Sequence, residues 1–197
     1  SIVKNKNFVS LKARLEESEQ DLAEHKLDYT ELKNDVDKHK FLLINEIKNG
    51  DFSDGTTNWS QLLSTISVTD NTLKILSTGG GANAHAYQVT DVDMVANKKI
   101  YVNFKCKVSS TNIKRIAVAY NGDANVPGNF IVPTTIITNP VANQEYDVST
   151  IITLDTNNNN TGKLRLFIRM ESDTAALANG TYSTIQFVKA IDLKRKF

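Results

Sequence analysis

The alternating run 163–170 carries the side chains best suited to bind a ligand. Its leucine, isoleucine and methionine residues alternate with Lys163, Arg165, Phe167 and Arg169. Because consecutive side chains of a β-strand point to opposite faces, we expect these four on the face turned away from the core. An exposed phenyl ring between two guanidinium groups suits an anionic polymer such as a teichoic acid, through charge-assisted hydrogen bonds and a stacking surface. The alternative is a solvated or inter-subunit face, with Phe167 covered by a neighbour.

A second run, 100–108, shows the same alternation. Its polar face holds Tyr101, Asn103, Lys105 and Lys107. If this strand pairs with the strand at 163–170, their polar faces form one cationic and aromatic groove. The pattern itself does not show that the two strands pair.

Two further tyrosines lie near expected strand ends, where loops can reach a ligand. Tyr87 comes shortly after a triple glycine, and Tyr120 directly precedes an Asn-Gly turn. With the two alternating faces they complete the set of predicted ligand contacts. These are Phe167, Arg165, Arg169, Tyr101, Lys105, Tyr87 and Tyr120.

Catalytic chemistry has little support. His25 and His39 fall in N-terminal heptads, so His85 is the one histidine in the rest of the chain, and no nucleophile motif or metal-ligand spacing accompanies it. The Gly79–Gly81 run lacks the Lys-Ser/Thr of a phosphate loop. Two carboxylates that converge in space could still hydrolyse a glycoside, since spatial pairs are not visible in a sequence. We expect a protein without enzymatic activity.

Composition limits the partners. The chain has 197 residues and a formal net charge of +1, so no bulk electrostatic attraction to nucleic acid or membrane is expected. Its longest apolar runs, such as 41–44, are far too short to insert across a bilayer. Cys106 is the single cysteine, which excludes an internal disulfide, and its alternating surroundings predict a small buried apolar residue.

The N-terminal segment has a heptad repeat from 8 to 40, without proline or glycine. A strict seven-residue apolar repeat predicts a parallel coiled-coil stalk, here over residues 1–40. The seam residues are Phe8, Leu11, Leu15, Ser18, Leu22, His25, Tyr29, Leu32, Val36 and His39. Opposite charges face each other at the flanking g and e positions, in the pairs Arg14–Glu19, Asp21–Lys26, Asp28–Lys33 and Asp35–Lys40. Aromatic residues at a and few leucines at d favour a homotrimer over a dimer, and a single amphipathic surface helix is the alternative.

After residue 40 the charge density falls and turn residues become frequent, which indicates a β-domain over 41–197. About ten short strands separated by Gly, Asn and Asp turns predict an all-β jelly-roll sandwich. The expected strands are 41–47, 62–68, 72–76, 84–90, 99–109, 113–120, 129–137, 145–154, 163–170 and 184–193.

The stretch 49–59 (NGDFSDGTTNW) resembles the opening of family 4/9-type carbohydrate-binding modules, which are galactose-binding-like jelly rolls. The close, 187–197, resembles the last strand of such domains in tail-fibre and baseplate proteins of phages that infect Gram-positive bacteria. In those proteins a coiled coil commonly precedes the module. Independently of the family, Phe52 is expected to anchor this loop in the core and Trp59 to close it, with a sugar-stacking platform as the alternative for Trp59.

The resemblance also implies a possible structural calcium between the opening loop and the last strand. Asp51, Asp54 and Asp192 could supply oxygen ligands. Two departures weigh against it, because Ser53 and Lys189 stand where acidic residues are usual in the family. No other cofactor is expected.

The resemblance and the stalk together predict a structural or adhesion component of a phage tail fibre or baseplate. A homotrimer would present its modules to host cell-wall polysaccharide or teichoic acid. It would lie beside other virion tail proteins and act at the host cell surface. The alternatives are a virion spacer or docking module without a ligand, and a bacterial surface adhesin.

Overall fold

The computed structural model describes residues 12–26, 45–129, 131–157, 160–173 and 175–193. The chain divides into two compact units, Ser1–Ile44 and Asn45–Phe197.

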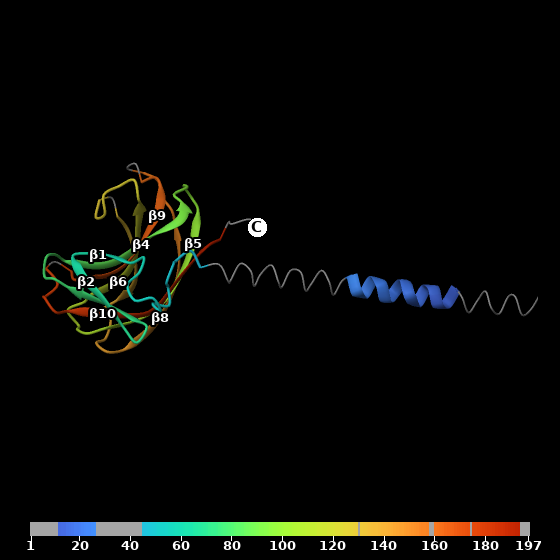
Figure 1. The fold of residues 1–197 in the computed structure, drawn as a ribbon, viewed down its shortest axis with the longest axis horizontal. Helices are drawn as coiled ribbons and strands as arrows, with labels where there is room; N and C mark the ends of the chain where they lie inside the picture. Colours follow the sequence, from blue (N-terminus) through green and yellow to red (C-terminus); the bar gives the residue numbers. More distant parts are fainter. Residues whose placement is uncertain (1–11, 27–44, 130, 158–159, 174, 194–197) are drawn as a thin grey trace, which may run out of the picture. The chain divides into compact units, whose positions relative to one another are not determined.

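In the first unit, residues 12–26 form an α-helix (Figure 1). Leu15 and Leu22, both at heptad a positions, are 60% and 57% exposed in the single chain. Lys12 and Glu16 form an i,i+4 ion pair of 3.7 Å on the helix surface. The two leucines of the predicted seam are therefore uncovered in the single chain. The seam residues before 12 and after 26 lie outside the described part of the chain. The coiled coil and the trimer stay predictions.

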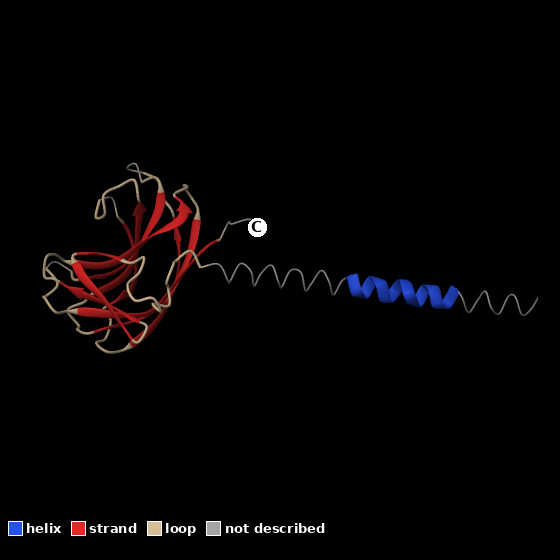
Figure 2. Cartoon of the chain, in the orientation of Figure 1, coloured by secondary structure: helices blue, strands red, loops and turns tan. Residues whose placement is uncertain are grey.

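The second unit is a sandwich of two five-stranded antiparallel sheets, which confirms the all-β prediction (Figure 2). The first, called the β9 sheet, has the order β1-β4-β9-β6-β7, and the second, called the β5 sheet, has the order β2-β3-β10-β5-β8. The strands are β1 (Ser60–Leu62), β2 (Ser64–Thr69), β3 (Thr72–Ser77), β4 (Asn83–Asp93), β5 (Lys99–Val108), β6 (Arg115–Gly122), β7 (Val132–Thr138), β8 (Glu145–Thr153), β9 (Lys163–Glu171) and β10 (Tyr182–Asp192).

Two expected strands differ from the structure. The expected strand 62–68 is two strands in different sheets, because the chain turns at Leu63, whose φ of 54° lies in the left-handed region. A side chain at such a φ is costly, so the turn is imposed by tertiary packing rather than by local preference. Of the expected strand 41–47, only 45–47 is described, and it is a loop.

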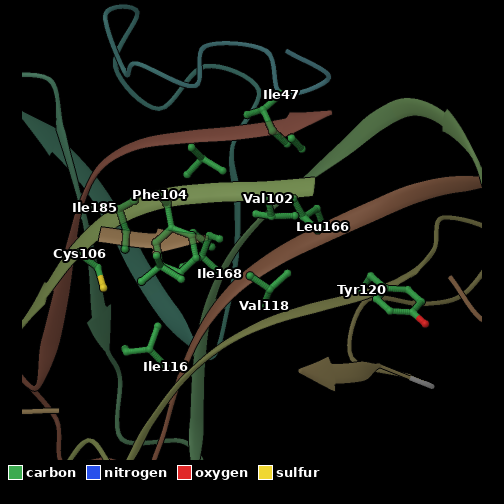
Figure 3. Close-up of a cluster of buried hydrophobic side chains, with 14 of the residues drawn as sticks. Ile47, Val102, Phe104, Cys106, Ile116, Val118, Tyr120, Leu166, Ile168 and Ile185 are labelled. Carbon is green, nitrogen blue, oxygen red and sulfur yellow. The ribbon is translucent and has the colours of Figure 1, made fainter. Parts of the chain in front are cut away.

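The core lies between the two sheets, and one face of each central strand supplies it (Figure 3). Central contributors are Val102, Phe104 and Cys106 of β5, Ile116, Val118 and Tyr120 of β6, and Leu166 and Ile168 of β9. Cys106 is 1% exposed, and burial raises the pKa of its thiol to about 12. Since burying one such side chain stabilises a fold by ~1.5–3 kcal/mol, this layer dominates the stability of the domain.

The loop that precedes β1 is fixed to this core by its two aromatic residues. Phe52 is fully buried and Trp59 is 7% exposed, with 5.5 Å between their ring centroids. Trp59 Nε1 donates a hydrogen bond of 3.1 Å to the carbonyl oxygen of Asn49. The side chain of Asn49 in turn donates to the carbonyl oxygens of Gly55 and Thr57. The expected anchoring roles of Phe52 and Trp59 are therefore confirmed.

In the part of the chain that the structure describes, no helix has the length and apolar character needed to cross a membrane.

Candidate functional site

The outer face of the β9 sheet brings together four of the seven predicted contacts. On β9, Leu164, Leu166, Ile168 and Met170 belong to the core, so Arg165, Phe167 and Arg169 point away from the β5 sheet. Strand pairing sets β4 and β6 residues beside them in rows, which are His85–Arg169–Ala117, Tyr87–Phe167–Ala119 and Val89–Arg165–Asn121. Alternation within β9 thus predicted the correct face, and pairing adds the neighbours.

Phe167 is fully buried on this outer face, so the expected exposed ring is wrong. Its ring centroid lies 5.0 Å from that of Tyr87 and 5.6 Å from that of His85, which meets it edge-on. These two side chains come from the neighbouring strand β4, whose pairing with β9 cannot be seen in the sequence of either strand. Phe167 therefore packs the outer face and is not a stacking platform.

Arg165 holds the loop between β6 and β7 against the outer face. Its Nη1 donates to Asn121 Oδ1 and to the carbonyl oxygen of Asn125, both at 3.0 Å. Its Nη2 donates to the carbonyl oxygen of Asp123 at 3.4 Å. Arg165 is only 6% exposed, and this burial lowers the pKa of its guanidinium. Arg165 thus mainly stabilises the fold by holding this loop.

Arg169, four residues further along β9 and on the same face, has different hydrogen-bond partners. Its Nη2 donates to Asn83 Oδ1 at 2.8 Å, and its Nε lies 2.5 Å from Glu171 Oε1. Glu171 also accepts a hydrogen bond of 2.7 Å at Oε2 from Arg115 Nε. Burial lowers the pKa of the Arg169 guanidinium, and the charge of Glu171 opposes that shift. Two arginines therefore share one buried carboxylate.

His85 lies beside Arg169 and is 2% exposed. Its Nδ1 is buried and has no hydrogen-bond partner among the described residues. Burial, and then the charge of Arg169, lowers the pKa of the imidazole to about 3. His85 is therefore neutral at any physiological pH.

Asn83, His85 and Arg169 line a pocket of about 360 Å³, which we call the Arg169 pocket. It is lined by Leu62, Leu63, Asn83, His85, Gly128, Ile131 and Arg169. Gly128 has a φ of 97°, and a Cβ there would lie 3.4 Å from Leu62 Cδ2, so the loop after β6 reaches the end of β1. Its lining thus combines aliphatic side chains with a guanidinium, an amide and an imidazole. Such a mixture suits small polar ligands that also have an apolar face.

The other three predicted contacts lie elsewhere. Tyr101 and Lys105 are on β5, in the other sheet, so the expected groove shared with β9 does not form. Tyr101 is within 3.0 Å of Ser149 Oγ, and Lys105 pairs with Glu145 at 3.9 Å. Tyr120 belongs to the core, where its hydroxyl donates to the carbonyl oxygen of Thr153 at 2.9 Å. Side-chain alternation alone could not assign these strands to different sheets.

The three carboxylates proposed for calcium are not brought together. Asp51 accepts hydrogen bonds from the backbone and hydroxyl of Ser53, which lower the pKa of its carboxyl. Asp54 is exposed, and Asp192 forms an ion pair of 3.3 Å with Lys98. Within the described ranges, no cluster of three or more His, Cys, Asp or Glu residues could hold a metal ion.

Sequence reasoning missed most of the pocket lining. The alternation of 83–89 contained a signal, because it puts Asn83, His85 and Tyr87 on one face of β4. The sequence contains no such signal for Leu62, Gly128 and Ile131. These residues come close to one another because the loop after β6 folds against the end of β1.

Comparisons with known proteins support the fold. No protein-family model matches the sequence, and no curated protein matches it. Among solved structures, the chain is similar to a family 16 carbohydrate-binding module, with 12% identity, a TM-score of 0.50, and coverage of 75% of this chain and 100% of that chain. It is also similar to the CBM22-2 xylan-binding domain of Paenibacillus barcinonensis Xyn10C, with 12% identity, a TM-score of 0.52, and coverage of 73% and 97%.

A phage protein has the same fold in part. Tailspike protein 4 of bacteriophage CBA120, in its enzymatically active domain, matches at 14% identity with a TM-score of 0.50. The match covers 76% of this chain but 22% of that one, so the chain spans about a fifth of the tailspike domain. At these identities the likeness is one of fold: the second unit is a sandwich like those of carbohydrate-binding modules.

Proposed function

We propose that the chain is a saccharide-binding adhesion module on an oligomeric stalk, and that the Arg169 pocket is its sugar site. The observation that carries the proposal is the composition of that pocket on a carbohydrate-binding-module sandwich. It combines aliphatic side chains with a guanidinium, an amide and an imidazole. Nearly complete coverage of two carbohydrate-binding modules supports the proposal.

Each part of the pocket has a role toward a sugar. Leu62, Leu63 and Ile131 would contact the C–H face of a pyranose ring and remove its apolar area from water. Asn83 and Arg169 would donate hydrogen bonds to ring hydroxyls, and hydrogen bonds to a charged donor are the stronger kind. Such a shallow contact predicts weak binding by a single module.

Oligomerisation would compensate for weak single sites. Leu15 and Leu22 are exposed on the helix, as seam residues awaiting partner chains would be. Three modules on one parallel stalk raise the effective concentration for the second and third contacts and so give tight attachment. We propose the setting of a phage tail fibre or baseplate, with host cell-wall polysaccharide or teichoic acid as partner and other virion proteins as neighbours. The partial fold likeness to a phage tailspike supports this setting.

The rival is a spacer or docking module of the virion that binds no sugar. The observation in its favour is that Phe167 and Arg165, two central predicted contacts, serve the packing of the outer face. A bacterial surface adhesin with the same architecture would use the same pocket.

A glycan array and a pull-down with Gram-positive cell walls separate these functions. Leu63→Gly and Arg169→Gln should abolish retention of the full chain, because both remove pocket lining. Lys105→Gln, on the β5 sheet, is the matched control and should be retained like the parent. No retention of the parent chain on any saccharide would favour the spacer.

A further inference from the structure

Arg169 has hydrogen-bonding capacity to spare inside the pocket. A guanidinium carries five N–H donors, and the contacts of Arg169 use Nη2 toward Asn83 and Nε beside Glu171. Nη1 donates to none of the described residues, and it is not among the buried unsatisfied atoms, so solvent reaches it. The outer edge formed by Nη1 and Nη2 is therefore available to a planar or tetrahedral anion.

Arg169 shares its carboxylate with a second arginine. Arg115 and Arg169 both pair with Glu171, whose side chain is 7% exposed. Arg115 also pairs with Asp173 at 2.9 Å, and the side chains of that pair are 33% and 57% exposed. The two guanidinium groups and the two carboxylates balance in charge, and Arg169 is the less exposed of the two arginines. A ligand anion on Arg169 therefore adds negative charge to a neutral cluster, which favours a singly charged anion over a doubly charged one.

His85 adds an unused polar atom in the same corner. Its residue is 2% exposed, and its buried Nδ1 has no partner among the described residues. A buried imidazole nitrogen without a hydrogen bond is unfavourable, and a ligand oxygen or hydroxyl would offset that cost. Because the imidazole is neutral, it can act toward the ligand without adding a second charge.

Leu63, another lining residue of the pocket, is held in an unfavourable backbone conformation. Its φ of 54° is unusual for leucine, and its side chain is 42% exposed at the pocket rim. Backbone conformations of this kind are unfavourable for leucine and persist where the surrounding structure imposes them, often at binding sites. The strain therefore presents an apolar side chain to the pocket rather than to the core.

From these four observations we infer that the Arg169 pocket selects an acidic saccharide, whose singly charged group binds the Nη1–Nη2 edge of Arg169. This inference rests on the proposed sugar site and adds the chemical class of its ligand. A uronic-acid carboxylate and a sugar-linked phosphodiester share the required chemistry, namely one negative charge with two oxygens that can accept from the guanidinium. The sugar ring would then lie against Leu62, Leu63 and Ile131.

Isothermal titration calorimetry of the full chain tests the inference with three probes. Tetragalacturonic acid carries carboxylates, its methyl ester has nearly the same shape without charge, and a glycerol phosphate oligomer carries phosphodiesters. We expect the acid, the phosphate oligomer or both to bind at least tenfold more tightly than the ester at 50 mM NaCl. The preference should shrink at 500 mM NaCl, because salt screens the ion pair.

Variants assign the preference to Arg169. Arg169→Gln should remove the preference for charge, so that the acid, the phosphate oligomer and the methyl ester all bind equally weakly. Lys105→Gln should leave the preference unchanged, and circular dichroism of each variant verifies the fold. If neither the acid nor the phosphate oligomer binds the parent more tightly than the ester does, the inference is overturned while the proposed function stands. If none of the probes binds and no other saccharide is retained on a glycan array, the proposed function fails as well.

Discussion

Arg165 on β9 and Asn121 on β6 are directly opposite each other, and Arg165 Nη1 donates to Asn121 Oδ1 at 3.0 Å. Asn121 Nδ2 in turn donates to the carbonyl oxygen of Asn129 at 2.9 Å. The pair therefore holds both the near and the far part of the loop that contributes Gly128 to the pocket. A buried arginine here organises the site from outside it.

Replacing that arginine should cost stability. Arg165→Lys keeps the charge, but an ammonium group lacks the planar fork of N–H donors with which the guanidinium reaches three oxygen atoms. Buried acceptors therefore lose their partners. We expect the free energy of unfolding to fall by ~1–3 kcal/mol in urea titrations. Arg169→Lys is the matched comparison and should cost less, because a lysine keeps the charge that pairs with Glu171 and the hydrogen bond lost is the single one to Asn83 Oδ1. Equal losses would show that the loop contacts of Arg165 contribute nothing of their own.

His85 predicts a pH dependence of stability with a definite sign. Its pKa is about 3 in the folded state and about 6.5 in the unfolded chain. A lowered histidine pKa means that the contribution is fully present above pH 6.5 and is lost as pH falls toward 3. Between pH 7.5 and pH 5 the free energy of unfolding should drop by ~2 kcal/mol from this residue alone.

His85→Gln isolates that contribution from those of the other titrating groups. The difference between parent and variant should decrease by the same ~2 kcal/mol over this pH range in chemical denaturation. A difference that stays constant with pH would mean that the buried imidazole does not change its protonation on unfolding.

Leu63→Gly separates binding from folding. Glycine adopts a φ of 54° without the steric cost that leucine has, and relief of that strain offsets the lost packing and the flexibility of the unfolded glycine. We expect stability within ~1 kcal/mol of the parent together with loss of saccharide retention. A variant that folds and still binds as the parent does would remove the apolar lining from the account.

The stalk prediction depends on Leu15 and Leu22. Leu15→Asp combined with Leu22→Asp places charges at two a positions of the seam, where burial between helices is unfavourable. Sedimentation equilibrium at micromolar concentration should change from trimer to monomer. Gln20→Asp, at an outward f position, should remain trimeric. A parent chain that sediments as a monomer would contradict the stalk and the avidity that it supplies.

Alternation within strands was enough to predict much of the sandwich, and its limits were those of pairing. Leu164, Leu166 and Ile168 lie in the core as expected, because burial follows directly from the period of two. The exposure of Phe167 was predicted wrongly, since its cover comes from β4, about 80 residues earlier in the chain.

Backbone conformation and sheet assignment explain the remaining differences. The turn at Leu63 splits one apparent strand into β1 and β2, and leucine gives no local sign of a positive φ. Tyr101 and Arg165 both belong to alternating runs with a polar face, but their strands lie in different sheets. The sheet to which each strand belongs is decided by long-range pairing. The pocket was therefore beyond reach from the sequence, although five of its lining residues fall within strands that had been predicted, namely Leu62, Leu63, His85, Ile131 and Arg169.

The central claim is that saccharide binds at the Arg169 pocket, and backbone amide chemical shifts of the intact protein test it most directly. On titration with Gram-positive cell-wall saccharide fragments, we predict saturable shifts at Asn83, His85 and Gly128, with little change at Tyr101 and Lys105. Saturable shifts confined to the β5 sheet, or no shifts at saturating saccharide, would contradict the account.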